Sequence, residues 1–177
     1  MGNKKTTTSE WIVVRDSRIH GKGVFAAKDI QRGTEVIEYV GKKGTKKESD
    51  DVADRDTDAN KENEKNGAVY LFELNKKQDL DGNVSWNTAR LINHSCDPNC
   101  ETEGDDKHVW IVALRDIKKG EEINYNYNYD IDDFEEHPCH CGSKRCVGFI
   151  LDEKLWPRLR KKVAWKKNLG KRKTGRS

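Results

Sequence analysis

Short stretches in which apolar and polar residues alternate recur along much of this chain, and turn-forming residues separate them. Alternation with a period of two residues is typical of strands that bury one face. The predicted strands are Trp11–Arg15, the end of Ser17–Ala27, Glu35–Val40, Ala68–Leu74 and His108–Leu114. Little of the chain has a helical pattern, apart from a helical turn predicted over Thr88–Asn93. Strands joined by short turns predict a mainly β domain.

The segments between these strands are polar and contain Gly, Asn and Asp. Ile30–Thr34 and Gln78–Asn83 are predicted turns, and Ile117–Ile123 closes the β-rich part. Lys46–Asn66 has eight acidic and five basic residues and hardly an apolar one. This stretch is predicted to be an exposed helix or a mobile insert, and not core.

The composition fits one polar domain. The chain has 177 residues, of which 33% are hydrophobic and 37% charged, and this length accommodates a single core. No apolar run approaches the length of a membrane span, and residues 1–8 lack an apolar signal core. We therefore expect a soluble, intracellular monomer with no membrane contact.

Charge is distributed unevenly along the chain. Residues 158–177 hold ten Lys or Arg and no acidic residue, whereas residues 1–157 carry a net charge of −7 within a total of +3. Such basic ends often contact DNA or another polyanion. A solvated end that only aids solubility is an equally good interpretation of the same pattern.

The cysteines suggest a metal site. Their number, five, is odd and cannot form a complete disulfide framework. Cys139, Cys141 and Cys146 are spaced as three ligands of a tetrahedral zinc, and Cys96 is the candidate fourth ligand. The alternative is that these cysteines are small packed hydrophobes without a metal. Cys100 has no evident partner and is predicted to be a packed or free thiol.

Three further motifs carry candidate chemistry. Gly21–Gly23 is either a simple tight turn or a place where backbone groups approach a ligand without obstruction by Cβ atoms. Asn93 and His94 lie in a polar segment, where a histidine is often only a hydrogen-bonded structural residue. Within Asn124–Tyr129, a strand would place three phenols on one face as an aromatic wall, unless this is merely an exposed β-surface.

Together these motifs resemble the SET domain family of protein-lysine methyltransferases, in the family's order over roughly residues 10–150. The matching pieces are Gly21–Phe25, Ile37–Gly41, Tyr70–Phe72, Ala89–Asn99, Gly120–Tyr127 and the three C-terminal cysteines. The resemblance implies a mainly β, β-clip-like fold of small sheets. It also implies a pseudoknot, in which Asn93–His94 threads under a loop, and a zinc-bound post-SET segment at the C-terminal side.

The resemblance divides the chain into a flexible N-terminus (residues 1–9), a SET domain (10–130, with a polar insert at about 44–67), a post-SET zinc segment (131–151) and a basic tail (152–177). The chain departs from the family's usual sequence in three respects. Trp86–Asn87 stands where Gly-Asn is usual, Leu91 replaces the usual Phe, and five cysteines are too few for the multi-zinc pre-SET cluster that some members carry.

The resemblance implies S-adenosylmethionine as cofactor, with S-adenosylhomocysteine as its product, and one zinc ion. The implied cofactor-binding residues are Lys22, Gly23, Arg90, Asn93, His94, Tyr127 and Phe149. Tyr127 falls on the catalytic tyrosine, and Tyr70 and Tyr125 on the lysine channel. The implied zinc ligands are Cys96, Cys139, Cys141 and Cys146.

The implied activity is lysine methylation of a histone or another basic chromatin-type protein, in the nucleus of a eukaryote or the cytoplasm of a prokaryote. Tyr125 stands where Phe favours higher methylation, so we expect mainly monomethylation. The competing hypothesis is a catalytically weak SET-like module that uses its basic tail on DNA or chromatin. A purely structural zinc protein is a third possibility, which leaves the tyrosine run unexplained.

Overall fold

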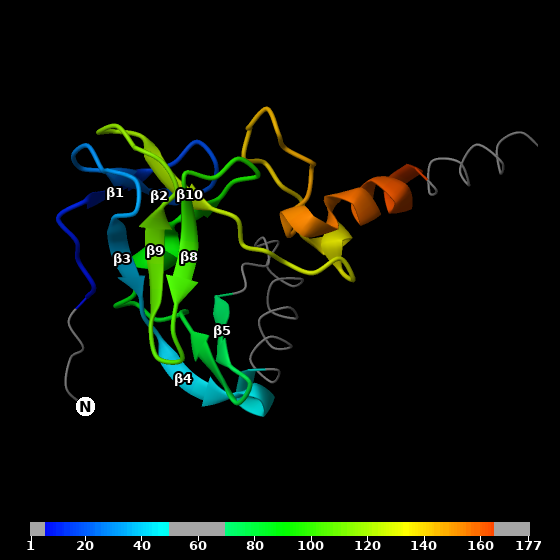
Figure 1. The fold of residues 1–177 in the computed structure, drawn as a ribbon, viewed down its shortest axis with the longest axis horizontal. Helices are drawn as coiled ribbons and strands as arrows, with labels where there is room; N and C mark the ends of the chain where they lie inside the picture. Colours follow the sequence, from blue (N-terminus) through cyan, green and yellow to red (C-terminus); the bar gives the residue numbers. More distant parts are fainter. Residues whose placement is uncertain (1–5, 50–69, 165–177) are drawn as a thin grey trace, which may run out of the picture.

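The computed structural model describes residues 6–49 and 70–164, and within them ten strands form three small sheets (Figure 1). The strands are β1 (Ile12–Asp16), β2 (Lys22–Ala26), β3 (Glu35–Tyr39), β4 (Lys42–Thr45), β5 (Leu71–Asn75), β6 (Gln78–Asp81), β7 (Asn93–His94), β8 (Cys100–Gly104), β9 (Val109–Ala113) and β10 (Glu122–Tyr125). Three 3-10 helices, η1 (Thr88–Leu91), η2 (Phe134–Glu136) and η3 (Glu153–Leu155), lie between or after them. The prediction of a mainly β fold of small sheets is confirmed.

The first sheet has the order β1-β2-β10-β7 and forms the platform of the candidate site. Its pairs β1–β2 and β2–β10 are antiparallel, but β7 runs parallel to β10, with Asn93 opposite Asn124 and His94 opposite Tyr125. The other two sheets have the orders β3-β9-β8 and β4-β6-β5. The parallel pair joins two segments far apart in the sequence, as the pseudoknot implied by the sequence requires.

Alternation located the strands with a strong apolar pattern but missed polar ones. The predicted turn over Gln78–Asn83 is wrong, because β6 occupies its first four residues and pairs with both β4 and β5. In β6 the buried Asp79 accepts a 2.5 Å hydrogen bond from Lys46 Nζ, so a charged residue is tolerated inside the sheet. The missed strands β4 and β8 lie at sheet edges, where charged side chains are common.

Two segments differ from the expected pattern in other ways. β10 ends at Tyr125, and Asn128 has a φ of +55°, so the tyrosine run does not continue as one strand. Of the polar stretch Lys46–Asn66, residues 46–49 are helical and the rest lies outside the described residues. The first two residues of the predicted strand Ala68–Leu74 also lie outside the described residues, and β5 begins at Leu71.

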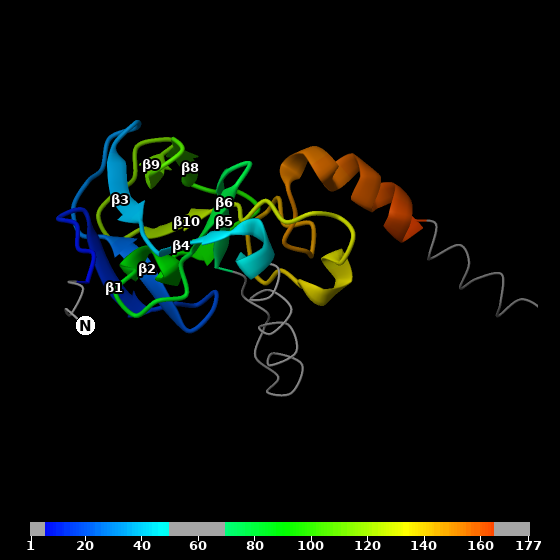
Figure 2. The ribbon, with the colours of Figure 1, turned by 90° about the horizontal axis from the view of Figure 1, so that it is seen from below.

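Among the described residues, buried side chains form two clusters. The larger cluster lies between the sheets and includes Val24, Ile37, Ile111 and Ile123. The smaller cluster lies in the C-terminal part, which Figure 2 shows beside the sheets. Its buried members are Cys96, Ile131, Phe134, Cys139, Leu151, Trp156 and Leu159. Residues 156–164 are helical, so the basic segment is folded at least as far as residue 164.

Within the two described stretches, no helix combines the length and apolar character needed to cross a lipid bilayer.

Candidate active site

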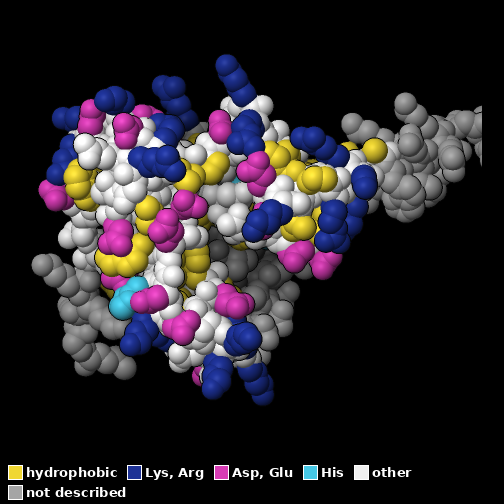
Figure 3. Space-filling model, viewed as in Figure 1, with side chains coloured by type: hydrophobic (Ala, Val, Ile, Leu, Met, Phe, Trp, Pro, Cys, Tyr) yellow, Lys and Arg dark blue, Asp and Glu magenta, His cyan; other side chains and the backbone are white. Residues whose placement is uncertain are grey.

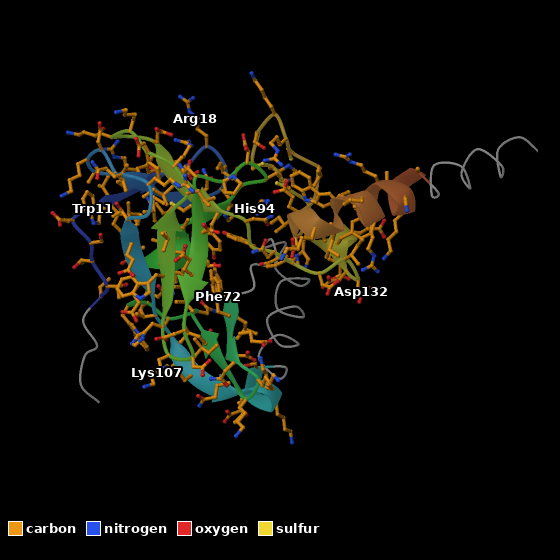
Figure 4. All side chains as sticks on the ribbon, viewed as in Figure 1. Trp11, Arg18, Phe72, His94, Lys107 and Asp132 are labelled. Carbon is orange, nitrogen blue, oxygen red and sulfur yellow. The ribbon has the colours of Figure 1, made fainter. Side chains whose placement is uncertain are left out.

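The polar pair Asn93–His94 is held at the centre of the molecule. η1 ends at Leu91, and the short strand β7, which comes next in the chain, pairs in parallel with β10. The two side chains are 8% and 4% exposed, so their polar atoms depend on protein partners or a ligand. Figure 4 shows His94 between the sheets and the C-terminal segment.

A pocket opens where the Ile19–His20 turn faces the C-terminal segment. Three residues expected to bind the cofactor line it, namely Asn93, His94 and Tyr127. The remaining lining residues are Ile19, His20, Tyr129, Glu136, His137, Pro138, Cys139, His140, Cys141 and Ile150. The pocket therefore joins the first sheet to the cysteine-containing segment.

The other expected cofactor residues, although described, lie outside this lining. Lys22 directs its ammonium group to Asp16 at 2.5 Å, while its carbonyl accepts a 3.2 Å hydrogen bond from Asn93 Nδ2. Gly23 is buried in β2, and Phe149 packs edge-on against Phe134. Arg90 stands in η1, close enough to Tyr39 for its charge to act on that phenol.

Sequence reasoning missed most of the lining. Three of the missed residues lie beside or between the C-terminal cysteines, namely His137, Pro138 and His140. Their place in the sequence was a signal, because residues next to metal ligands are held close to the metal site. His20 also offered a signal, since it immediately precedes the Gly21–Gly23 turn. Ile150 gave none, because an isolated apolar residue in a loop is equally consistent with packing.

Aromatic side chains form a continuous row through the site. Tyr125 and Tyr127 are at its middle, with ring centroids 4.9 Å apart. Phe72 continues the row on one side, 6.2 Å from Tyr125, and Tyr129 on the other, 5.8 Å from Tyr127. Tyr39 lies beyond Phe72 and His137 beyond Tyr129. The expected aromatic wall therefore exists, but strand and loop residues build it together.

The central phenols are neutral hydrogen-bonding groups. Burial raises the pKa of Tyr127 and of Tyr125 well above the ordinary value for a phenol, and neighbouring phenols add to the rise. Tyr127 donates its hydroxyl hydrogen to the carbonyl of Ile92 at 2.8 Å. Tyr70, the third expected channel residue, immediately precedes β5 and is one of the phenols that raise both pKa values.

The four predicted zinc ligands come together in space. The Sγ atoms of Cys96, Cys139, Cys141 and Cys146 all lie within 4.8 Å of one another. The Cys96 and Cys139 sulfurs are 3.7 Å apart, close to the ~3.8 Å that Zn–S bonds of about 2.3 Å give in a tetrahedron. Cys100 belongs to the larger core, where burial raises its pKa to about 12.

The sulfurs of this cluster also influence one another's protonation. The hydrogen bond from Cys139 lowers the pKa of the Cys96 thiol, and the same contact raises the pKa of Cys139. Several thiolates this close repel one another unless a positive ion lies between them. Four convergent sulfurs are the donor set that structural zinc prefers, so the cluster fits that metal.

His94 links the cysteine cluster to the pocket. Its Nδ1 accepts a 3.3 Å hydrogen bond from the Tyr127 amide, and its Nε2 lies 3.4 Å from Cys96 Sγ. Because Nδ1 is an acceptor, the ring hydrogen is on Nε2 and is directed at the sulfur. The histidine thus connects the tyrosine that lines the pocket to the metal-type ligands.

Comparison with known proteins agrees with this architecture. The model of the SET domain family matches residues 21–128, which include β2 through β10 and both Asn93 and Tyr127. The chain therefore belongs to the SET domain family. The C-terminal cysteines lie beyond the matched residues.

The similar curated proteins are large. The chain is 39% identical over 150 residues to histone-lysine N-methyltransferase trithorax of Drosophila virilis, a match that covers 82% of this chain and 4% of that protein. It is 37% identical over 151 residues to histone-lysine N-methyltransferase trr of Drosophila melanogaster, covering 80% and 6%. It is 38% identical over 152 residues to human histone-lysine N-methyltransferase 2D, a match that covers 78% of this chain and 2% of that protein. The chain thus spans a small fraction of these relatives.

Proposed function

We propose that this chain is a protein-lysine N-methyltransferase that uses S-adenosylmethionine. The observation that carries the proposal is the placement of Asn93, His94 and Tyr127 around one pocket, next to the row of buried phenols. Membership of the SET domain family and the names of the similar proteins support the same activity.

The reaction needs alignment more than acid or base groups. When bound, the cofactor would supply a methyl group from a sulfonium. The lysine nitrogen would gain a C–N bond to this methyl group as its C–S bond breaks, and a neutral thioether would leave. The amine must first lose a proton to solvent, because its reference pKa is about 10.4. A channel walled by the phenols of Tyr70, Tyr125 and Tyr127 favours the neutral amine by excluding water. Tyr127, itself a neutral phenol, orients the reacting groups and does not act as a base.

The cysteine cluster would hold one zinc ion through Cys96, Cys139, Cys141 and Cys146. This ion would attach the C-terminal segment to the position two residues after His94. That attachment would fix the wall of the pocket formed by His137, Pro138 and His140. The role is structural, because four protein ligands leave no open coordination position.

The expected product is monomethyl-lysine. Tyr125 is 6% exposed and packs between Phe72 and Tyr127. Its hydroxyl can hold a water molecule or the amine by a hydrogen bond, in the space that a second methyl group needs.

We propose a histone or another basic chromatin-type protein as substrate, on the strength of the names of the relatives. In a eukaryote this substrate places the chain in the nucleus. The basic C-terminal segment is proposed to add contacts with DNA or chromatin, in line with its ten cations.

Two measurements test the activity. Purified protein with labelled S-adenosylmethionine and histones should transfer label to lysine, and calorimetry should show binding of S-adenosylhomocysteine. Asn93→Ala should weaken that binding, while Asn83→Ala, a change at an exposed asparagine outside the pocket, should not. Absence of both binding and transfer in zinc-replete wild-type protein would refute the proposal.

A further inference from the structure

The carboxylate of Glu122 joins two sides of the candidate site. Glu122 opens β10, and its Oε1 atom accepts a 2.7 Å hydrogen bond from Ser17 Oγ and a 2.8 Å hydrogen bond from Asn93 Nδ2. Ser17 and Asn93 are separated by 76 positions in the sequence, and neither bond belongs to the sheet ladder. A single oxygen therefore connects the glycine turn, β10 and β7.

This contact fixes the orientation of the Asn93 side chain. An ionised carboxylate can only accept hydrogen bonds, so the amide nitrogen and not the amide oxygen has to face it. The same nitrogen lies 3.3 Å from the His20 carbonyl and 3.2 Å from the Lys22 carbonyl. Among the described residues, none donates a hydrogen bond to Asn93 Oδ1, which remains available as an acceptor in a residue that lines the pocket.

The other side of the contact fixes the turn. Ser17 Oγ accepts a 2.9 Å hydrogen bond from the Ile19 amide, and the Ser17 amide donates a 2.9 Å hydrogen bond to the Gly21 carbonyl. Gly21 has a φ of +46°, which favours glycine. A Cβ atom on Gly23 would overlap Glu122 Oε1 and lie 2.9 Å from Ser17 Cβ, so the carboxylate is packed directly against the strand that follows the turn.

We propose that Glu122 is a positioning residue for cofactor binding. It holds the Asn93 amide and the turn containing Ile19 and His20 in one arrangement, so that the pocket presents the Asn93 oxygen to an N–H donor of the bound cofactor. Glu122 is absent from the pocket lining and acts through Asn93 and Ser17. This inference rests on the proposed function, because it assigns a role within the same pocket.

The neighbouring carboxylate provides a matched control. The Glu121 carboxylate accepts a 2.9 Å hydrogen bond from Arg115 Nη2 and another from the Lys118 amide. Its partners therefore differ from those of Glu122. Glu122→Ala should raise the dissociation constant of S-adenosylhomocysteine by about 10- to 100-fold, the range expected when hydrogen bonds to a charged group are lost. Glu121→Ala should leave it within about twofold of wild type, as expected of a surface ion pair.

Further readouts separate positioning from a general loss of structure. Glu122→Gln retains an Oε1 acceptor and should restore most of the affinity. KM for S-adenosylmethionine should rise in Glu122→Ala while kcat changes by less than about threefold, because Glu122 does not touch the reacting atoms. In the absence of cofactor, hydrogen exchange at Ile19 to Gly23 should be faster in Glu122→Ala than in Glu121→Ala or Glu122→Gln.

Ser17→Ala serves if Glu122→Ala does not fold. It removes the hydrogen bond to Glu122 and the one from the Ile19 amide but leaves the contact between Glu122 and Asn93 in place, so it should weaken cofactor binding less than Glu122→Ala. Equal affinity and equal exchange in wild type, Glu122→Ala and Ser17→Ala would overturn the positioning role alone. If wild-type protein binds no S-adenosylhomocysteine, the proposed function fails, and the positioning role fails with it. Restored affinity in Glu122→Gln together with slow exchange of the turn would support it.

Discussion

At the scale of single residues, Tyr127 contributes both its hydroxyl and its ring to the packing of the site. Its hydroxyl donates to Ile92 at 2.8 Å, and its ring lies between Tyr125 and Tyr129. Tyr127→Phe keeps the ring contacts and removes the hydroxyl. We expect kcat to fall by about 100-fold, the loss typical when one preorganised polar group of an active site is removed, whereas unfolding stability should drop by only about 1 kcal/mol.

Tyr129→Phe is the control for this change, because Tyr129 lines the same pocket and is the adjacent ring in the row. Single-turnover kinetics with labelled cofactor would compare the two variants. An equal, small decrease in both would show that the Tyr127 hydroxyl has no special part in methyl transfer.

Tyr125 governs the number of methyl groups in our proposal. Tyr125→Phe leaves the aromatic contacts with Phe72 and Tyr127 in place and removes only a buried hydroxyl. The vacated space should admit an already methylated amine, so the product should shift from monomethyl- toward di- or trimethyl-lysine. Mass spectrometry of a methylated histone peptide decides the point. Trimethyl-lysine as the main wild-type product, or no shift in the variant, would contradict the assignment.

At the scale of elements, the cysteine cluster joins two segments that share no strand pairing. Cys96 follows β7, whereas Cys139, Cys141 and Cys146 lie in the loop after η2. Removing one or two sulfurs from a four-ligand site should release the metal and loosen this loop. Metal analysis should find about one zinc per wild-type chain, the stoichiometry of a single four-cysteine site, and little in Cys141→Ser/Cys146→Ser.

Cys100→Ser is the matched cysteine control, since this thiol is buried in the larger core and lies apart from the cluster. It should keep its zinc. Equal zinc content in wild type and Cys141→Ser/Cys146→Ser would exclude the site, as would native protein without any zinc.

The helical residues 156–164 complete the smaller core. Leu159 is 2% exposed and packs in the same cluster as Cys96, Cys139 and Trp156. Leu159→Ala should lower the unfolding free energy of the C-terminal part by about 2–5 kcal/mol, as for other buried leucines. Arg160 is the exposed neighbour of Leu159, and Arg160→Ala should change this unfolding free energy by less than about 0.5 kcal/mol.

Hydrogen exchange over residues 131–164 would measure this difference directly. If protection of that part is the same in Leu159→Ala and wild type, the helix is not a stabilising part of the core. Faster exchange that spreads to Cys139 would instead show that helix packing and the cysteine loop are coupled.

At the scale of the whole molecule, the sequence predicted what depends on local pattern. The strands with apolar alternation, such as β3 and β9, appear within one residue of their predicted ends. The polar strands β4, β6 and β8 were missed, because they are defined by pairing with distant residues, such as Lys43 of β4 opposite Leu80 of β6. Pattern alone cannot show contacts that only the tertiary fold creates.

The candidate site shows the same division. Cysteine spacing was enough to propose Cys139, Cys141 and Cys146 as ligands with Cys96 as the candidate fourth, and the resemblance to SET domains implied the full set. The contacts of Glu122 could not be predicted, because Ser17, Asn93 and Glu122 are far apart in the chain and form no motif. The tyrosine run predicted the row of three phenols but not its backbone, since β10 ends at Tyr125.

The distribution of charge over the whole chain leads to the last prediction. On the face in Figure 3, the C-terminal part carries Lys and Arg side chains among hydrophobic and acidic ones. Residues 165–177 add six Lys or Arg and no acidic residue, and they follow directly after the packed helical residues. A chain that ends at Ala164 removes these six charges but keeps Trp156 and Leu159 in the smaller core.

We expect the shortened chain to bind DNA more weakly and with a smaller salt dependence, because each neutralised phosphate releases a counterion. The slope of log affinity against log salt should fall by roughly 3 to 5, since each contact contributes about 0.9 and not every cation reaches a phosphate. Fluorescence anisotropy with a DNA duplex at several salt concentrations measures the slope, and S-adenosylhomocysteine affinity serves as the control for folding. An unchanged slope with intact cofactor binding would mean that these cations do not contact DNA, and would favour the interpretation that they only aid solubility.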